Sequence, residues 1–309
     1  MRDLIIIGGG PAGVAAAVYA ARKRLSTVLI AKEVGGQSIV SDGIENWIGT
    51  TKLSGTELAK NLATHLEAVK ADVLELSIGE EVTALRKNMN TEGFVVDLKS
   101  SGTRGGRAVL VASGAGRRKL DVPGAEKFEN KGLTYCASCD GPLFADMDVA
   151  VVGGGNAGFE TALQLLAYCK SVTLIHRHKD FKADAVTIEK ASAHPNMRII
   201  RHAEPTEVMG EQFVTGLKYK DKDSGEVKKL AVTGIFVEAG VIPNTGFAEG
   251  LLALDPVKRI VVDAKNQRAS VDGVWAAGDC TDELYHQNNI AAGDGVKALE
   301  DLYLWLKKQ

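Results

Sequence analysis

The stretch Leu4-Ile5-Ile6-Ile7-Gly8-Gly9-Gly10-Pro11-Ala12-Gly13 carries the strongest fold signal in this sequence. Its first four residues are an apolar run rich in β-branched side chains, which is typical of a buried parallel strand. The next six match Gly-x-Gly-x-x-Gly, and residues 14–24 have the apolar spacing of a helix. A strand, this turn and a helix in that order predict a dinucleotide-binding α/β unit.

Each glycine of the pattern has a physical role in this turn. Gly8 permits the tight bend, Gly10 lets a pyrophosphate approach the backbone, and Gly13 lets the helix pack closely on the strand. The N–H groups at the start of the helix then bind the phosphates. We therefore expect one nucleotide site at Gly8, Gly10, Pro11, Ala12 and Gly13.

The same pattern returns after 153 − 8 = 145 residues. The strand 148–152 leads into Gly153-Gly154-Gly155-Asn156-Ala157-Gly158, and helical spacing follows. The chain therefore predicts a second nucleotide fold. Its expected site residues are Gly153, Gly155, Asn156, Ala157 and Gly158.

A basic turn follows the next strand, 172–175. It contains Arg177, Lys179 and Lys182, with His178 as a further donor. An acid at this strand end usually binds a ribose 2′-hydroxyl, whereas cations favour a 2′-phosphate. The turn therefore favours NADPH, and an ordinary solvated basic turn is the alternative.

Two thiols lie just ahead of the second glycine turn, in Tyr135-Cys136-Ala137-Ser138-Cys139-Asp140-Gly141. Thiols at this spacing can close a small disulfide, and neighbouring groups can depress the pKa of one of them. Asp140 follows directly and can exchange a proton with a leaving thiolate. We expect Cys136, Cys139 and Asp140 to be catalytic, because the pair lies between two nucleotide folds.

Other small-residue turns indicate close contact with a cofactor. Glycines beside the amide of Gln37 suit a flat ring whose edge needs hydrogen bonds, and Asp279, after a short buried strand, suits a ribityl hydroxyl. Metal-bound water is the alternative partner of Asp279, but no metal ligand set accompanies it. The further candidates in these turns are Gly36, Asn46, Ala112, Gly114, Gly278, His286, Gln287 and Asn288.

Length and composition set the outer limits. A chain of 309 residues predicts about two domains. Its net charge of −2 gives no indication of a nucleic-acid or membrane partner, and no apolar run approaches the ~18 residues of a membrane span. Four cysteines do not make a secreted disulfide framework, so we expect a cytoplasmic protein without a metal site. Cys169 and Cys280 are expected to be inert buried thiols.

The remaining pattern predicts further elements. Residues 54–71 form an amphipathic helix, and residues 73–111 alternate like antiparallel strands with turns at 88–90 and 102–106. Residues 198–237 indicate a β-meander with a polar hairpin at Lys222-Asp223-Ser224-Gly225. A strand at 259–262 and a final helix at 290–306 complete the prediction.

Taken together, these motifs resemble the low-molecular-weight thioredoxin reductase family over essentially the whole chain. The matching stretches are Gly8–Gly13, Gly35-Gly36-Gln37, Ile44-Glu45-Asn46-Trp47, Tyr135–Gly141, Gly153–Gly158 and Gly273–Asp279. The C-terminal runs Ile235–Thr245 and Asp279-Cys280-Thr281 also resemble the reductase half of alkyl hydroperoxide reductase flavoproteins. Those relatives carry an extra N-terminal thioredoxin-like module, which we do not expect in this chain.

The resemblance implies an α/β fold with two Rossmann-like domains of three layers (ββα), the second inserted into the first. Residues 1–114 and 241–309 would form a discontinuous FAD-binding domain. Residues 115–240 would form the NAD(P)H-binding domain and carry the redox cysteines. The resemblance also implies a homodimer and a disulfide that joins the two thiols.

The same resemblance assigns roles to single residues. Cys139 would face the flavin and accept its electrons, Cys136 would exchange with the partner disulfide, and Asp140 would handle the proton. A thiolate between a flavin and a protein disulfide does need a nearby proton donor. The flavin would be held by Gln37, Asn46, Asp279 and Gln287, among others.

Two departures from the family bear on the electron donor. Gly158 occupies a position where the family commonly has Ala, and glycine at this position favours NADH. The family's His-Arg-Arg-x-x-x-Arg reads here His176-Arg177-His178 followed by Lys182, so one guanidinium remains of three. Because Lys lacks the fork-shaped donor of Arg, phosphate recognition is weaker. NADPH stays only slightly ahead of NADH, and reduced ferredoxin is a third donor used by some relatives.

The sequence thus predicts an FAD-dependent enzyme that reduces a thioredoxin-type protein disulfide. Two alternatives stay open. The same chemistry can serve a peroxiredoxin-like or glutaredoxin-type partner. A flavin-binding redox sensor without turnover belongs to a different class, and the eroded basic turn is the feature that favours it.

Overall fold

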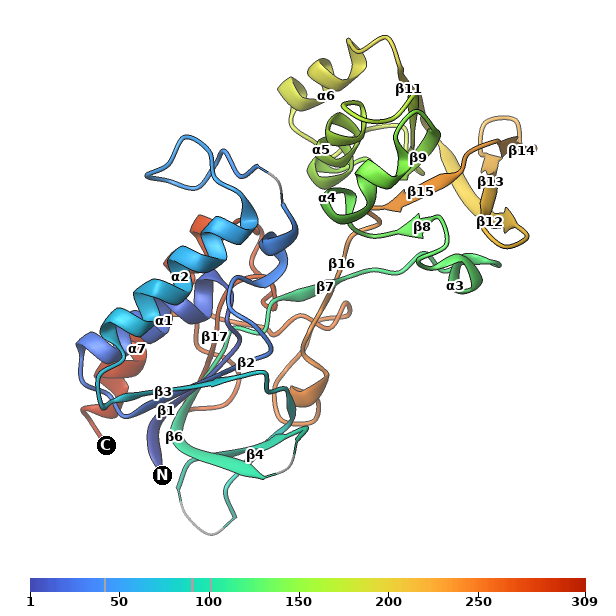
Figure 1. Cartoon of the computed structure of the whole chain (residues 1–309). Helices are drawn as coiled ribbons and strands as arrows, with labels where there is room; N and C mark the ends of the chain where they lie inside the picture. The colour runs from blue at the N-terminus through green and yellow to red at the C-terminus, as the bar shows by residue number, and fades with distance from the viewer. Residues whose placement is uncertain (42, 90–91, 101) are drawn as a thin grey trace. The chain divides into compact units, whose positions relative to one another are not determined.

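The computed structural model describes residues 1–41, 43–89, 92–100 and 102–309, with the side chains of these residues except 138, 139 and 241. The chain divides into two compact units. Unit 1 consists of Met1–Gly116 and Ile242–Gln309, and unit 2 of Arg117–Val241 (Figure 1). Unit 1 is therefore built from both ends of the chain, and unit 2 is an insertion.

Unit 1 is organised around a seven-stranded sheet with the order β3-β2-β1-β6-β5-β4, in which β17 also pairs with β6. The pairs among β3, β2, β1, β6 and β17 are parallel, whereas β4 and β5 run antiparallel to their neighbours. The strands are β1 Arg2–Ile7, β2 Thr27–Ala31, β3 Leu74–Ile78, β4 Val82–Lys87, β5 Phe94–Leu98, β6 Thr103–Val111 and β17 Val274–Ala276.

The alternation of side chains along β1 separates two cores. Leu4 and Ile6 pack with residues of the helices on one face, while Ile5 and Ile7 pack with β4, β5 and residues 248–260 on the other. Both faces of β1 are therefore buried, as expected for a central parallel strand. The helices on the first face are α1 Pro11–Arg22, α2 Gly55–Val69 and α7 Asn288–Leu306 (Figure 1).

Local sequence explains where two of these helices begin. α1 starts at Pro11, whose fixed φ suits the first helical position. α2 starts after Ser54, which forms a capping box with Glu57: the Glu57 N–H donates to the Ser54 hydroxyl, and the Ser54 N–H donates to the Glu57 carboxylate. Both signals are local in sequence, so they specify the two helix starts without reference to distant residues.

Unit 2 is also organised around a central sheet, which has five parallel strands in the order β11-β10-β9-β15-β8. A separate antiparallel sheet contains β12, β13 and β14. The strands are β8 Leu133–Thr134, β9 Asp148–Val152, β10 Ser171–Ile175, β11 Met197–Ile200, β12 Ala203–Gly210, β13 Val214–Asp221, β14 Val227–Leu230 and β15 Gly234–Val237.

The central strand β9 again faces two cores. Val149 and Val151 pack with the helix side, which includes α5 Asn156–Leu165 and α6 Ala185–Ser192. Ala150 and Val152 pack with residues of β12 and β13 on the opposite face. The two short helices α3 Ala125–Phe128 and α4 Ala137–Asp140 complete unit 2. The predicted fold class, α/β with two Rossmann-like units of which the second is inserted, is confirmed.

One prediction for residues 73–111 is wrong in its first and last parts. β3 is parallel to β2 rather than part of an antiparallel set, and Gly105 and Gly106 lie inside β6 rather than in a turn. Alternation cannot distinguish these cases, because a half-exposed parallel edge strand alternates like an antiparallel one. The predicted turn at 88–90 reaches Asn90, which lies outside the described residues.

Two further predictions need correction. The meander predicted for 198–237 extends only over β12, β13 and β14, since β11 and β15 belong to the parallel sheet. The strand predicted at Arg259–Val262 does not form; Ile260 instead makes isolated bridges to Leu254 and Thr281. Short apolar runs do not specify their partners, and tertiary contacts decide between sheets.

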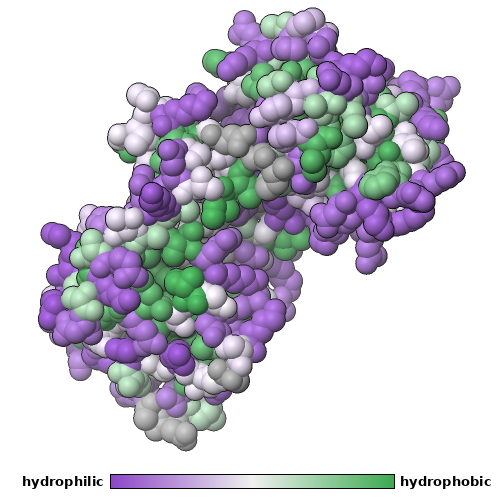
Figure 2. Space-filling model, in the orientation of Figure 1, coloured by the Kyte–Doolittle hydropathy of each residue, from purple (hydrophilic) through white to green (hydrophobic). Residues whose placement is uncertain are grey.

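The chain leaves unit 1 through β7 (Ala115–Arg117) and returns through β16 (Val241–Pro243), and these two strands pair with each other. Hydrophilic residues cover much of each unit on the face that Figure 2 shows. Within the part of the chain that the structure describes, every helix is too short or too polar to cross a membrane.

Candidate functional site

The first glycine turn lies between β1 and α1 and is held by backbone contacts alone. Gly8 has φ +119°, and a Cβ there would lie 2.0 Å from the Ala112 carbonyl oxygen. A Cβ on Gly13 would lie 1.9 Å from the Gly8 carbonyl oxygen. Both positions therefore require glycine, as their sequence roles predict.

Gly10 marks the open side of this turn. The nearest atom to a Cβ on Gly10 would be the Gly36 Cα at 4.0 Å, so two backbones without side chains face each other here. Among the described side chains, none caps the first turn of α1. The N–H groups at the start of α1 are thus available to an anion.

Two polar segments about 240 residues apart form a wall beside this turn. The Gln37 Nε2 donates to the Asp279 carboxylate at 3.3 Å, and the Asn46 Nδ2 donates to the Gln287 Oε1 at 3.0 Å. The Ser38 hydroxyl donates to the Asn288 Oδ1 at 2.9 Å. These bonds join the loop after β2 to the loop that precedes α7, so predicted residues from both ends of the chain come together.

Helix α7 positions this second segment. A Cβ on Gly295 would lie 2.2 Å from the Ala12 carbonyl oxygen, so α7 packs directly on the first turn of α1. His286 lies 3.6 Å from Asp279, between their Nδ1 and Oδ1 atoms. The Asp279 carboxylate beside it raises the pKa of His286, against the opposing effect of burial.

The arrangement fits a flavin dinucleotide. The bare backbone at Gly10 and Gly36 suits a pyrophosphate, and the uncapped start of α1 suits its charge. The side-chain amides of Gln37 and Asn46 suit hydrogen bonds to the edge of a ring. The Asp279 carboxylate suits a hydroxyl partner. The residues present therefore match what FAD requires of a site.

The second glycine turn, between β9 and α5, has nearly the same geometry. Gly153 has φ +139°, and a Cβ there would lie 2.1 Å from the Glu238 carbonyl oxygen. A Cβ on Gly158 would lie 2.2 Å from the Gly153 carbonyl oxygen, whereas Gly155 faces open space among the described atoms. The Ala that the family commonly has at position 158 would therefore not fit this turn without a backbone shift.

Asn156, at the start of α5, is tied to the next helix. Its Oδ1 accepts from the Asp184 N–H at 2.7 Å, and its Nδ2 lies 3.3 Å from the Asp184 carboxylate. Lys182 bridges to Gly155, and its N–H donates to the Gly154 carbonyl at 3.1 Å. The backbone of the basic turn therefore lies against the glycine turn.

The side chains of the basic turn are partly engaged with one another. The Arg177 Nε donates to the His178 Nε2 at 3.1 Å, so this His178 nitrogen acts as an acceptor. His176 is buried beside Gly154, and its Nε2 is bonded to the Asp180 carbonyl. Burial lowers the pKa of His176, which favours the neutral ring. Arg177, His178 and Lys182 are exposed, as a phosphate site needs.

An acid that the sequence did not single out lies beneath the second turn. The Glu238 carboxylate accepts from the Thr161 hydroxyl at 3.0 Å and from Arg117 at 3.4 Å. Burial raises the pKa of Glu238, although Arg117 and Thr161 act in the opposite direction. No local motif signals this cluster, because its three members come from distant parts of unit 2.

The thiol segment follows β8, and its residues 137–140 form the helix α4. Cys136 is disulfide-bonded, and its N–H donates to the Thr134 hydroxyl at 3.2 Å. The same hydroxyl makes a short hydrogen bond to the Asp140 carboxylate. Thr134, which the sequence did not indicate, thus fixes Asp140 next to the backbone of Cys136. The sequence predicts that Cys139 faces the flavin, but the Cys139 side chain lies outside those that the structure describes.

The other two cysteines are free and buried. Burial raises the pKa of both thiols to about 11, so they are protonated at neutral pH. Among the described residues, no group of three or more potential metal ligands is found. Cys169 and Cys280 are therefore buried, protonated thiols.

Comparison with known proteins agrees with these features. The model of the family described as "Pyridine nucleotide-disulphide oxidoreductase" matches residues 2–295. The F subunit of alkyl hydroperoxide reductase from Pseudomonas putida is 42% identical over 299 residues, which are 96% of this chain and 56% of that protein. The chain spans just over half the length of the curated relatives that it matches.

Two solved structures match the chain over almost its full length and theirs. The thioredoxin reductase from Lactococcus lactis, in its FR conformation, has a TM-score of 0.95 at 30% identity and 100% coverage of both chains. The thioredoxin reductase from T. acidophilum has a TM-score of 0.90 at 36% identity and 98% coverage of both. The chain therefore belongs to the pyridine nucleotide-disulphide oxidoreductase family, with the fold of the low-molecular-weight thioredoxin reductases that its motifs resemble.

Proposed function

We propose that this protein is a disulfide reductase that transfers electrons from a reduced pyridine nucleotide, through FAD, to a thioredoxin-type protein disulfide. The observation that carries the proposal is the disulfide-bonded Cys136 beside a fixed Asp140, in the same unit as a dinucleotide turn. Bound FAD would supply the two-electron step between nicotinamide and disulfide.

We assign the two nucleotides to separate units. FAD belongs to unit 1, where Gly8–Gly13, Gly36 and Gln37 lie beside Asp279 and Gln287. The pyridine nucleotide belongs to unit 2, at Gly153–Gly158 and the exposed basic turn. We also propose a homodimer, which sedimentation or light scattering would test.

The chain's own residues then divide the sulfur chemistry. Reduction of the Cys136–Cys139 disulfide takes up two electrons and one proton and gives a thiolate at Cys139 and a thiol at Cys136. Asp140, oriented by Thr134, removes the Cys136 proton as that sulfur attacks the partner disulfide. The mixed disulfide is then resolved by Cys139, which closes the original bond and releases a reduced partner.

A coupled assay tests this proposal. Purified protein with FAD is mixed with thioredoxin, a disulfide substrate that thioredoxin reduces, and NADPH, NADH or reduced ferredoxin in separate reactions. Turnover with a pyridine nucleotide supports the proposal. The absence of turnover with every donor contradicts it. Turnover with ferredoxin alone would show that ferredoxin, rather than a pyridine nucleotide, is the electron donor.

A peroxiredoxin-type partner is the second candidate. The similarity to the F subunit of alkyl hydroperoxide reductase, over just over half of that protein, favours it. Comparing the rates with purified thioredoxin and peroxiredoxin at equal concentration distinguishes the two partners.

A further inference from the structure

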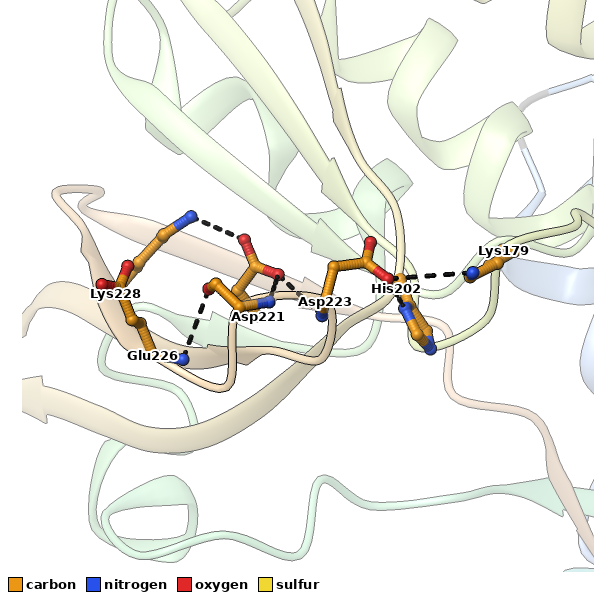
Figure 3. A network of polar contacts seen from close by, with 7 residues as sticks. Lys179, His202, Asp221, Asp223, Glu226 and Lys228 are labelled. Atoms are coloured by element: carbon orange, nitrogen blue, oxygen red, sulfur yellow. Dashed lines mark hydrogen bonds and ion pairs between the residues drawn. The ribbon is translucent and has the colours of Figure 1, made fainter.

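The basic turn after β10 has an acidic neighbour from another part of unit 2. The hairpin between β13 and β14 places Asp223 next to this turn, as Figure 3 shows. An acid at this strand end usually selects NADH, while cations select NADPH. The strand end itself is basic here, and the acid comes from a hairpin more than 40 residues further along the chain.

Asp223 contacts two basic side chains of this region. Its Oδ1 accepts from the His202 Nδ1 at 2.7 Å and lies 3.8 Å from the Lys179 Nζ. Lys179 belongs to the basic turn, and His202 follows β11 directly beside it. The Lys179 and Asp223 side chains are 70% and 65% exposed, so a nucleotide phosphate would have access to both.

Backbone bonds keep the hairpin in this position. The His202 N–H donates to the His178 carbonyl at 3.1 Å, and the Lys222 N–H donates to the His202 carbonyl at 2.9 Å. His178 is one of the predicted nucleotide-binding residues. The hairpin that carries Asp223 is therefore connected through His202 to the predicted site itself.

The hairpin is also fixed from within. The Asp221 carboxylate accepts from the Asp223 N–H at 3.0 Å and the Ser224 N–H at 3.2 Å, and the Lys228 Nζ donates to it at 2.6 Å (Figure 3). These bonds, with that of Lys228 as the main cause, lower the pKa of Asp221 to about 2. Asp223 thus stands on a turn whose shape is set by its neighbours.

Two other cations nearby, Arg177 and Arg201, have partners of their own. Arg177 donates to the His178 ring, and Arg201 lies over the Phe181 ring at 4.3 Å while its Nη1 donates to the Lys179 carbonyl. Asp180 lies on the same turn, but its described contact is the backbone carbonyl that meets His176. Asp223 is therefore the carboxylate that directly engages Lys179 and His202.

We propose that Asp223 is a specificity-determining residue that selects NADH over NADPH, by occupying Lys179 and His202 as an internal anion. A 2′-phosphate would have to approach this carboxylate and compete with it for the Lys179 ammonium and the His202 ring. A ribose 2′-hydroxyl meets no such repulsion. This inference rests on the proposed function, because it concerns the same nucleotide site.

Equilibrium binding to the full-length oxidised protein tests the inference. The variant Asp223→Asn is titrated by calorimetry with NADH, NADPH, 5′-AMP and adenosine 2′,5′-bisphosphate at low ionic strength. We expect NADPH and the bisphosphate to bind on the order of five-fold more tightly than to wild type, as for one unit charge near 4 Å in water. NADH and 5′-AMP should bind as before, and added salt should reduce the gain.

Three variants serve as controls. Glu226→Gln removes the same charge from the same hairpin, but the described hydrogen bonds of Glu226, to Ser224 and Asp221, use its backbone, so nucleotide preference should not change. Asp223→Glu keeps the charge and should keep the wild-type preference. Adding Lys179→Met to Asp223→Asn should cancel the gain in NADPH binding, because the released cation is then missing.

The possible results distinguish a failure of the specificity role of Asp223 from a failure of the proposed function. If both dinucleotides bind and Asp223→Asn leaves their ratio unchanged, or Glu226→Gln shifts it equally, the specificity role of Asp223 is wrong and the proposed function stands. If wild type and variant bind neither dinucleotide, the assignment of unit 2 to a pyridine nucleotide fails, and the inference fails with it.

Discussion

The two glycine turns of this chain have nearly the same backbone and different surroundings. At Gly8 and Gly153 an added Cβ would overlap a carbonyl oxygen at 2.0 and 2.1 Å, and at Gly13 and Gly158 at 1.9 and 2.2 Å. These distances follow from how a strand enters a helix around a bound pyrophosphate. The turn therefore predicts a dinucleotide site but does not indicate which dinucleotide binds there.

The surroundings carry the difference. The first turn lies beside amides and a carboxylate that bond to one another across about 240 residues, as in Gln37–Asp279. The second lies beside an exposed basic turn, and its own backbone rests on the buried Glu238. Selectivity thus depends on side chains from other elements, and mutations in the turns and in their walls should have separable effects.

Valine in either turn should have the largest effect. Gly13→Val overlaps the Gly8 carbonyl and should reduce bound flavin at least about tenfold, since backbone must move. Gly158→Val should reduce pyridine-nucleotide binding to a similar degree and leave the protein yellow. Flavin absorbance and nucleotide titration measure the two losses.

A matched control separates these effects from general damage. A Cβ on Gly246 would meet no described atom within 4 Å, so Gly246→Ala should retain both nucleotides. If Gly158→Val loses its flavin as completely as Gly13→Val, the two turns do not serve separate nucleotides.

A smaller effect is expected in the wall of the first turn. Asp279→Asn removes the carboxylate that raises the pKa of His286, so this pKa should fall in the variant. In wild type the raised pKa contributes stability below the unfolded imidazole pKa, and this contribution is lost as pH rises through the folded value. The stability advantage of wild type over Asp279→Asn should therefore shrink with rising pH.

Thermal unfolding across this pH range, with NMR of the His286 ring, tests that expectation. An advantage that grows with pH would show that the Asp279–His286 pair does not hold the proton.

The wall of the second turn should respond in the acid range. Burial raises the pKa of Glu238, so the folded protein keeps a proton that the unfolded chain has lost. Stability from this residue should fall as pH rises above the ordinary glutamate value. The stability of wild type relative to Glu238→Gln should therefore fall over the same range in denaturant unfolding, and a rise would place the dominant influence on Arg117 instead.

The smallest effect is expected at the buried thiols. Because the pKa of Cys169 and Cys280 is raised to about 11, an alkylating reagent at neutral pH should modify neither in the oxidised native protein. Mass spectrometry before and after denaturation measures this directly. Rapid labelling of Cys280 in the native state would contradict its burial.

Local sequence was sufficient for the turns and for most elements. The glycine positions follow from sterics within six residues, and β1 and α1 follow from their apolar periods. The helix predicted at 54–71 forms at Gly55–Val69 because Ser54 and Glu57 define its start. These features need no knowledge of distant contacts.

Distant contacts explain what the sequence did not predict. β3 and β11 pair in parallel with strands whose patterns resemble their own, and Arg259–Val262 does not form a strand at all. Thr134, Glu238 and Asp223 carry no motif, since their importance arises from partners brought close by the fold. Side-chain networks of this kind appear only once the topology is known.

The central claim is that electrons leave the flavin through Cys139 and reach the partner by way of Cys136. The most direct measurement is steady-state reduction of thioredoxin by wild type, Cys136→Ser and Cys139→Ser at equal flavin content. The account predicts that both variants stay yellow and lose disulfide turnover, by a factor of roughly a thousand or more for a missing nucleophile. Full-speed turnover by either variant would contradict it.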